Sequence, residues 1–203
     1  MNAGFSSLAE LKAAVVAAAL RTRTDFDAAL VSLGLGAAAM IEAHLNRSLA
    51  WSASATHDTS ARLLVLSLPK YPLASVASVQ IKGAPGDAFT TVSDLIQMID
   101  LRSGLLHFMG CPGAETDTLR VTYAGGYWWD VSEDSSGTLP ATATLLPAVI
   151  RSAWLLQVQA MLEATNLFGA QSSTKKGKEG AALAELDVLP IVQTMLRPFR
   201  RMI

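Results

Sequence analysis

The hydrophobic period of the chain changes twice, and these changes limit the folds that the sequence can adopt. Before Trp51, apolar residues recur at intervals of three or four, as on one face of a helix. From Trp51 to Asp130, β-branched and aromatic residues are broken by Gly, Pro and Asp clusters, which is typical of short strands joined by tight turns. Helical spacing returns at Pro147. The sequence therefore predicts an α+β fold in which a β insertion separates two helical parts.

Two helices are expected before the insertion. Residues 7–10 have the Ser-x-x-Glu spacing of a capping box, and the helical spacing that follows predicts a first helix reaching about Arg23. Residues 24–27 repeat the capping pattern with Asp in the last position. They predict the start of a second, longer helix that ends near Asn46.

The insertion contains two well-defined strand patterns, because apolar and polar residues alternate over Ala77–Ile81 and over Leu119–Tyr123. Weaker strand candidates lie between them, over Phe89–Val92, Leu95–Ile99 and Leu105–Phe108. Beyond the insertion, Pro147 is expected to open a long helix. A short terminal helix is expected over Pro190–Leu196 and is predicted to stop at Pro198.

These elements predict a mainly helical bundle, with two N-terminal and two C-terminal helices, interrupted by a central antiparallel β-sheet subdomain. The expected divisions are 1–50 for the N-terminal helices, 51–130 for the β insertion, and 131–203 for the helices that complete the bundle. Within the last part, residues 171–180 lack apolar periodicity and are expected to form a flexible arm.

Composition excludes several classes of protein. Hydrophobic residues make up 51% of the chain and charged residues 16%, which excludes disorder and favours apolar surface that meets another protein chain. A net charge of −1 argues against a dedicated nucleic-acid-binding domain. The single cysteine, Cys111, excludes an internal disulfide and a cysteine-rich zinc site, and it fits a reducing, intracellular compartment.

Neither a membrane span nor a signal peptide is expected from the N-terminal sequence. Its most apolar run, Ala13–Leu20, is far shorter than the roughly 20 residues that cross a bilayer. Glu10 and Lys12 precede this run, so the basic start of a secretory signal is missing.

One stretch imitates a cofactor site. Gly34–Ala39 fits the G-x-G-x-x-A pattern of dinucleotide-binding loops, and Asp58 lies near the distance of a ribose-binding acid. The stretch continues a helical face, however, and no βαβ alternation follows it, so close helix packing is the preferred interpretation. The three histidines lack metal-ligand spacing, and Cys111 lies in a turn with no base indicated nearby. No catalytic residue, cofactor or metal is predicted, and the chain is not expected to be an enzyme.

Two other features point to contacts with other molecules. Tyr127, Trp128 and Trp129 are adjacent and cannot all face one core in an extended segment, so local packing and a subunit interface both remain open for them. The arm carries cations that could neutralise phosphates or could form a solvated loop, and these are Lys175, Lys176 and Lys178.

Several stretches follow one another in a recognisable order. They are two helices ending near Leu45-Asn46-Arg47 with Trp51 after them, Leu68–Val79 (similar to LP-x-x-PL-x-SV-x-SV), Val121–Tyr127 (similar to V-T-Y-x-x-G-Y), the helix Pro147–Glu163, and Met195–Arg200 (similar to LL-x-PYR). In this order they resemble the head-tail connector proteins, also called head completion or adaptor proteins, of long-tailed bacteriophages and prophages. The sequence departs from the family's pattern at the Trp128-Trp129 pair and in the long lysine-bearing loop.

The resemblance implies a structural virion protein in the neck, assembled in the bacterial host cytoplasm, with no enzymatic activity. Family members form a ring of about twelve copies below the portal, joining the DNA-filled head to the tail or stopper. DNA passes through the ring without sequence specificity, and no membrane is involved. A tail-completion protein on the tail side of the neck is the first alternative, and a nucleotide-binding enzyme is a distant second.

The resemblance also assigns residues to contacts. It implies that the segment Pro190–Ile203 docks against the portal. The positive charge of the arm, and not the resemblance, leads us to expect that its lysines line the channel or become ordered on binding the portal. The predicted portal and subunit interface comprises Leu196, Arg197, Phe199, Arg200, Arg201, Tyr127, Trp128 and Trp129.

Overall fold

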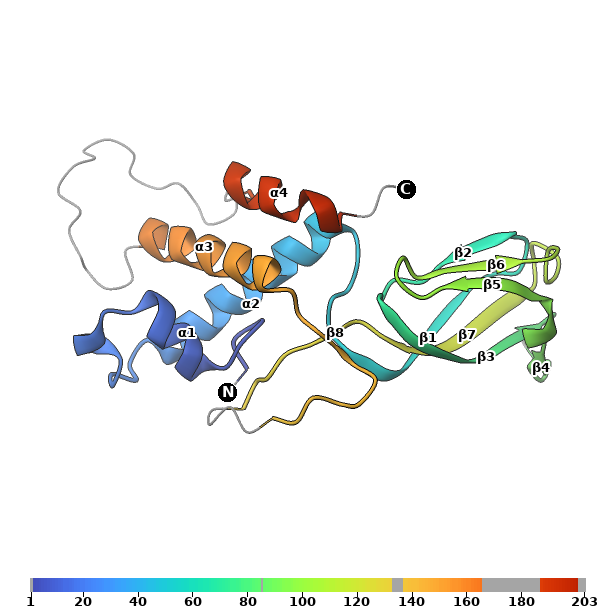
Figure 1. Ribbon diagram of the computed structural model, residues 1–203, viewed down its shortest axis with the longest axis horizontal. Coiled ribbons are helices and arrows are strands. Elements are labelled where there is room, and N and C mark those ends of the chain that lie inside the picture. Colours follow the sequence, from blue (N-terminus) through green and yellow to red (C-terminus); the bar gives the residue numbers. More distant parts are fainter. Residues whose placement is uncertain (1, 85, 133–136, 166–186, 201–203) are drawn as a thin grey trace. The chain divides into compact units, whose positions relative to one another are not determined.

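The computed structural model describes residues 2–84, 86–132, 137–165 and 187–200 of the chain. It divides into two compact units. The helical unit comprises Met1–Asn46, Trp129–Leu139 and Leu146–Ile203, and the strand unit comprises Arg47–Trp128 and Pro140–Leu145. The chain contains both helices and antiparallel sheets, which confirms the predicted α+β class (Figure 1).

Among the described residues, the helical unit contains two α-helices near the N-terminus and two near the C-terminus. They are α1 (Leu8–Val15), α2 (Asp27–Leu45), α3 (Ala148–Thr165) and α4 (Pro190–Leu196), with the short 3-10 turns η1 (Ala18–Leu20) and η4 (Arg197–Phe199). Helix α3 contacts the other three, and α1 also contacts α2. The buried side chains of α3 include Trp154 and Val158, both fully buried.

Helix α1 is shorter than the sequence pattern predicts. It begins as expected, because the Ser7 hydroxyl accepts a hydrogen bond from the Glu10 backbone N–H at 3.2 Å. It ends at Val15, and Val16 is extended. The Arg21 guanidinium donates to the carbonyl oxygens of Ala13 and Val16 at 2.8 and 3.0 Å, so a side chain from beyond the helix replaces the hydrogen bonds of a further turn. The predicted extension to Arg23 was therefore wrong.

Helix α2 ends as predicted, with Asn46 in the left-handed conformation. At its start, Phe26 is the N-cap and makes no side-chain capping bond, so the capping role expected for residue 24 was wrong. With 19 residues and a mean hydropathy of 1.6, α2 is long and apolar enough to cross a membrane by length and composition alone. The sequence prediction was based on the shorter run Ala13–Leu20 and did not identify this helix as a candidate. Core helices of globular proteins pass the same test, and Leu30, Ile41 and Leu45 are fully buried here.

The strand unit consists of two antiparallel sheets and one small parallel pair. The four-stranded sheet has the order β1-β7-β3-β4, and the three-stranded sheet has the order β2-β6-β5. Their bounds are β1 Ser52–Ser60, β2 Val65–Ser67, β3 Leu73–Lys82, β4 Thr90–Thr91, β5 Ile96–Asp100, β6 Leu105–Phe108 and β7 Thr118–Gly125, with the 3-10 turn η2 at Ser93–Leu95. Strand β8 (Tyr127–Trp128) pairs in parallel with β9 (Thr144–Leu145).

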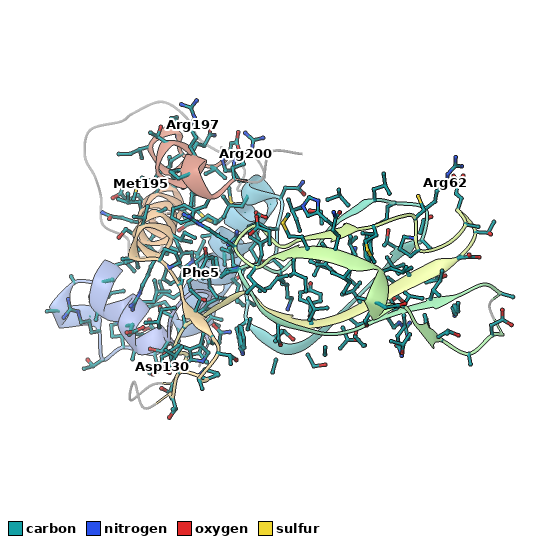
Figure 2. The ribbon with its side chains drawn as sticks, turned by 45° about the vertical axis from the view of Figure 1, so that its right-hand side comes forward. Phe5, Arg62, Asp130, Met195, Arg197 and Arg200 are labelled. Atoms are coloured by element: carbon teal, nitrogen blue, oxygen red, sulfur yellow. The ribbon has the colours of Figure 1, made fainter. Side chains whose placement is uncertain are left out.

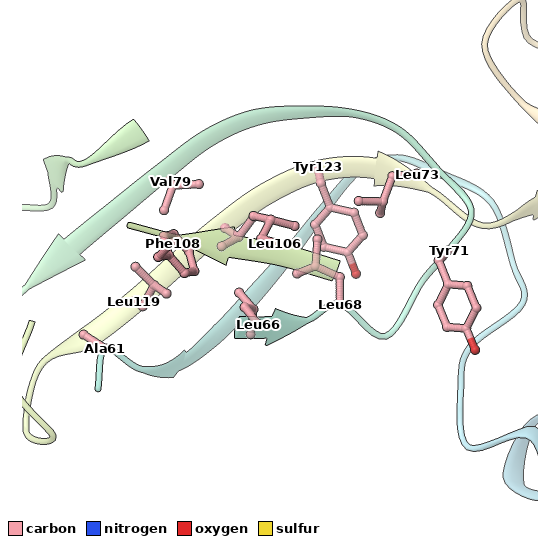
Figure 3. Packing of buried hydrophobic residues seen from close by; sticks show 11 residues of the cluster. Ala61, Leu66, Leu68, Tyr71, Leu73, Val79, Leu106, Phe108, Leu119 and Tyr123 are labelled. Carbon is pink, nitrogen blue, oxygen red and sulfur yellow. The ribbon is translucent and has the colours of Figure 1, made fainter. Parts of the chain in front are cut away.

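Inward-facing and outward-facing side chains alternate along the strands, and the inward-facing ones form one buried layer between the two antiparallel sheets. The two best-predicted strands, β3 and β7, are neighbours, with Val79 opposite Val121. Figure 3 shows Leu66, Leu106 and Phe108 of the three-stranded sheet within the same cluster as Val79, Leu119 and Tyr123 of the four-stranded sheet. The three weaker strand candidates are confirmed as β4, β5 and β6.

Candidate assembly interface

The helical unit has a groove whose lining is basic and polar. It has a volume of about 380 Å³ and lies where the end of α2 meets α4 and η4, lined by His44, Pro190, Gln193, Thr194, Arg197 and Arg200. Two residues of the predicted interface, Arg197 and Arg200, thus lie at one concave surface. Figure 2 shows both side chains projecting away from the ribbon of α4.

A buried glutamine on α3 fixes the position of α4. The Gln157 side chain is fully buried, and its carbonyl oxygen accepts a hydrogen bond from the Leu189 N–H at 3.0 Å. Pro190 then occupies the first turn of α4, where its missing N–H costs no hydrogen bond. Val192 and Leu196 are fully buried, so the opposite side of α4 is left facing outward.

The end of α4 differs in detail from the prediction. The α-helix ends at Leu196, as expected, but Pro198 lies within the 3-10 turn η4 instead of terminating the helical path. This extra turn keeps Arg197 and Arg200 near the same groove. Leu196 serves the core of the unit, and Phe199 is partly exposed.

The charge of the groove defines what it can bind. Both arginines are exposed, and none of the six lining residues carries a carboxylate. No Asp or Glu occurs in the sequence after Asp187. Guanidinium groups bind carboxylates through two parallel hydrogen bonds, so the groove suits an acidic segment of a partner protein.

The three adjacent aromatics are divided between the two units. Tyr127 lies in the strand unit, where the buried Arg47 guanidinium lies 5.0 Å from its ring centroid and 3.8 Å from that of Tyr71. Trp129 lies in the helical unit, where its ring centroid lies 5.2 Å from that of Phe5 in an edge-to-face arrangement. Its indole N–H donates to the Gly4 carbonyl at 2.9 Å. The prediction that the three cannot share one core is confirmed. Trp128 is partly exposed, and an intersubunit role for these rings stays a prediction.

Sequence reasoning missed Phe5, which belongs to no periodic pattern. Its ring is buried and lies 5.2 Å from Trp129 and 5.9 Å from Trp154. This aromatic cluster joins the N-terminal segment to two distant parts of the sequence. A buried aromatic cluster of this kind shows the unit's own packing and is not a ligand site.

The glycine pattern in α2 has a packing role, which confirms the preferred interpretation. Gly34 lies inside the helix, where a Cβ atom would stand 2.0 Å from the Ala3 carbonyl oxygen. The Gly34 carbonyl accepts a hydrogen bond from the Trp154 indole at 2.8 Å. The pattern therefore does not form the loop between strand and helix that dinucleotide binding needs.

The remaining polar candidates are dispersed. His44, His57 and His107 lie on α2, β1 and β6, and Cys111 is exposed. Within the described ranges, no group of three His, Cys, Asp or Glu side chains could hold a metal ion. Arg201, Lys175, Lys176 and Lys178 lie outside the described residues.

An ion pair with two parallel hydrogen bonds lies on the strand unit. Arg120 donates to both carboxylate oxygens of Asp58, at 2.8 and 2.6 Å. These hydrogen bonds, helped by the positive charge of Arg120, lower the pKa of Asp58 below its ordinary value. Asp58 on β1 and Arg120 on β7 are directly opposite each other on an exposed face of the sheet. We therefore interpret their ion pair as a structural contact between the two strands.

No protein-family model matches the chain, and no curated protein matches it. Solved structures do share its fold. A chain in the neck of an empty gene transfer agent (GTA) particle, computed with C6 symmetry, is 19% identical with a TM-score of 0.59, and the match covers 97% of this chain and 89% of that one.

Two further structures agree. A chain in the virion of a native GTA particle is 18% identical, with a TM-score of 0.60 and coverage of 97% and 89%. A chain in the neck of a native GTA particle, computed with C12 symmetry, is 19% identical, with a TM-score of 0.51 and coverage of 94% and 91%. The shared fold therefore extends over nearly the whole chain and includes both units.

Proposed function

We propose that this chain is a structural subunit of a virion neck, a head-tail adaptor that forms a ring below the portal and joins the DNA-filled head to the tail or stopper. The observation that carries the proposal is the fold shared, over 97% of the chain, with a chain from the neck of a GTA particle. The order of sequence motifs supports the same position independently. Neither line of support depends on a catalytic or cofactor site.

The symmetry of the related particles supports a ring. Necks containing chains of this fold were computed with C6 and C12 symmetry. In a cyclic ring every copy meets its neighbours through two different surfaces, which requires extensive protein contacts but no enzyme chemistry. Twelve copies of the 21.4 kDa chain would weigh about 257 kDa.

The basic groove supports a more specific role for the C-terminal segment. We assign the groove to the portal, through an acidic segment of the portal that binds Arg197 and Arg200. The lysines of the arm, Lys175, Lys176 and Lys178, are assigned to the channel or to the portal contact. Both assignments follow from charge, because phosphates and carboxylates are the partners that these side chains bind best.

The test is native mass spectrometry of the protein alone and mixed with the portal of its own particle. The expected result is a species, or a gain on the portal, of ring-sized mass. The double variant Arg197→Glu with Arg200→Glu is expected to weaken portal binding at least tenfold, because both contacts become repulsive. The matched control is Arg62→Glu with Lys82→Glu, which reverses two charges on the strand unit.

Each outcome separates one part of the proposal. Unchanged portal binding by the Arg197 and Arg200 variant would remove the groove from the portal contact while leaving the adaptor in place. A wild-type chain that stays monomeric and ignores the portal would overturn the adaptor position. Binding to a tail protein in its place would favour the tail-completion alternative.

A further inference from the structure

The two sheets of the strand unit present outer faces of opposite character. On the four-stranded sheet the outward positions of three neighbouring strands are polar, and the register places Asp58 and Gln80 on either side of Arg120. Thr56 and Ser78 lie in the same way on either side of Thr122. This is the composition expected of a sheet face in contact with water.

The three-stranded sheet presents an apolar outer face. Val65, His107 and Met98 lie opposite one another in one row across β2, β6 and β5. The exposed fractions of Val65 and Met98 are 47% and 53%. Further exposed apolar residues lie just outside the strands, and these are Leu64 (56% exposed), Leu101 (47%) and Met109 (65%).

Charge is nearly absent from this face. Among the residues of β2, β5 and β6, Asp100 is the one with a permanent charge at neutral pH. Its carboxylate is engaged locally, because it accepts hydrogen bonds from the Ser103 hydroxyl and from the backbone N–H of Arg102 and Ser103. The exposed Arg102 directly follows Leu101, so a cation lies beside this part of the surface.

We propose that the apolar outer face, defined by Leu64, Val65, Met98, Leu101 and Met109, packs against the next copy of this chain in the ring. The inference rests on the proposed function and adds a subunit contact to it. In a cyclic ring every copy has a neighbour at the same position, so one contact covers this face on all subunits equally. The related necks have the cyclic symmetry that such a contact needs.

The size of the face fits this occupant. A fully buried aliphatic side chain corresponds to roughly 60–120 Å² of apolar surface, so these half-exposed side chains offer about 200 Å² together. A stable two-body interface buries about 800 Å² on each partner. The face is therefore too small to hold a free dimer, and it matches the apolar core of one contact within a ring, surrounded by a polar rim.

The test introduces charge on the face without disturbing the fold. The double variant Val65→Glu with Met98→Glu changes two exposed side chains, and the matched control is Thr56→Glu with Ser78→Glu on the polar face of the other sheet. Thermal unfolding should show both variants folded. We expect the ring fraction, measured by native mass spectrometry with portal present, to fall at least tenfold for the first variant and to stay unchanged for the control.

The native thiol of Cys111 supplies a second measurement that needs no substitution. Cys111 is exposed and lies two residues beyond Met109. Its rate of labelling by a maleimide reagent should fall at least tenfold when the free chain assembles into the ring, because the neighbouring copy covers this corner of the face.

Failure of this inference can be distinguished from failure of the proposed function. If the wild type forms a ring, the glutamate variant forms it equally well and Cys111 labels at the free rate, the face is open in the ring and the inference is wrong, while the proposed function stands. If the glutamate variant forms the ring but loses a tail protein, the occupant is that partner and the inference is wrong. A wild type that forms no ring overturns both.

Discussion

Two glycines in one helix test the packing of the helical unit. Replacement of glycine by alanine inside a helix normally stabilises it by about 1 kcal/mol. At Gly36 the new Cβ would meet the Met161 methyl group at 3.6 Å, an ordinary contact, so Gly36→Ala should show this gain. At Gly34 the new Cβ would lie 2.0 Å from the Ala3 carbonyl oxygen, so the N-terminal segment must move away.

The cost of that movement can be estimated from what the segment holds. Displacement exposes part of the buried Phe5 ring, whose full burial contributes roughly 1.5–3 kcal/mol, and it weakens the hydrogen bond from Trp129 to the Gly4 carbonyl, which contributes about 1 kcal/mol. Against the propensity gain of about 1 kcal/mol, we expect Gly34→Ala to lower the free energy of unfolding by about 1–3 kcal/mol.

Urea unfolding followed by tryptophan fluorescence measures this difference, because Trp129 and Trp154 both lie at the affected contact. The two variants should change the free energy of unfolding in opposite directions. Equal stabilisation by both variants would show that the Ala3 carbonyl does not pack closely against Gly34, and the close contact between the N-terminal segment and α2 would be refuted. A loss of stability in Gly36→Ala would instead refute the use of helix propensity at this site.

Three further substitutions test local contacts. Ser7→Ala should lower the free energy of unfolding by about 1 kcal/mol through loss of the cap on α1, and Ser7→Gly by only a few tenths, with equal effects refuting the cap. Trp129→Phe keeps an aromatic ring beside Phe5 but leaves the Gly4 carbonyl unpaired, so urea unfolding should show a loss of about 1 kcal/mol. Asp58→Asn should cost less than about 1 kcal/mol at pH 7, since both partners are more than a third exposed. Because the folded-state pKa of Asp58 is lowered, its contribution is present above the unfolded-state pKa of about 3.9 and is lost as the pH falls through the folded-state value, so wild type and variant should converge in urea unfolding below pH 4.

The elements that were predicted correctly have local signals. The start of α1 is set by Ser7, and the start of α4 by Pro190. Strands β3 and β7 were evident because alternation is a property of consecutive residues. The end of α1 was missed because Arg21 supplies the capping bonds from a separate turn, an interaction that helix periodicity does not encode.

The residues of the candidate interface also include some that the sequence identified and others that only distant contacts reveal. Arg197 and Arg200 were named from the sequence as interface residues, but their common groove depends on His44, more than 150 residues earlier. Phe5 and Gln157 carry no sequence signal, because their roles depend on contacts with distant segments. The apolar outer face was also hidden, since alternation shows that a strand has two faces but does not reveal that the exposed one is apolar.

The aromatic contacts of the N-terminal segment have a consequence for the order of folding. Phe5 leaves the ribosome long before the partners of its ring, which are Trp129 and Trp154. All strands of the two antiparallel sheets lie within residues 52–125, so these sheets can form while α3 is still being translated. Phe5 is therefore synthesised well before it can reach its native contacts, and a nascent chain stalled before α3 would hold finished sheets and an unfinished helical unit.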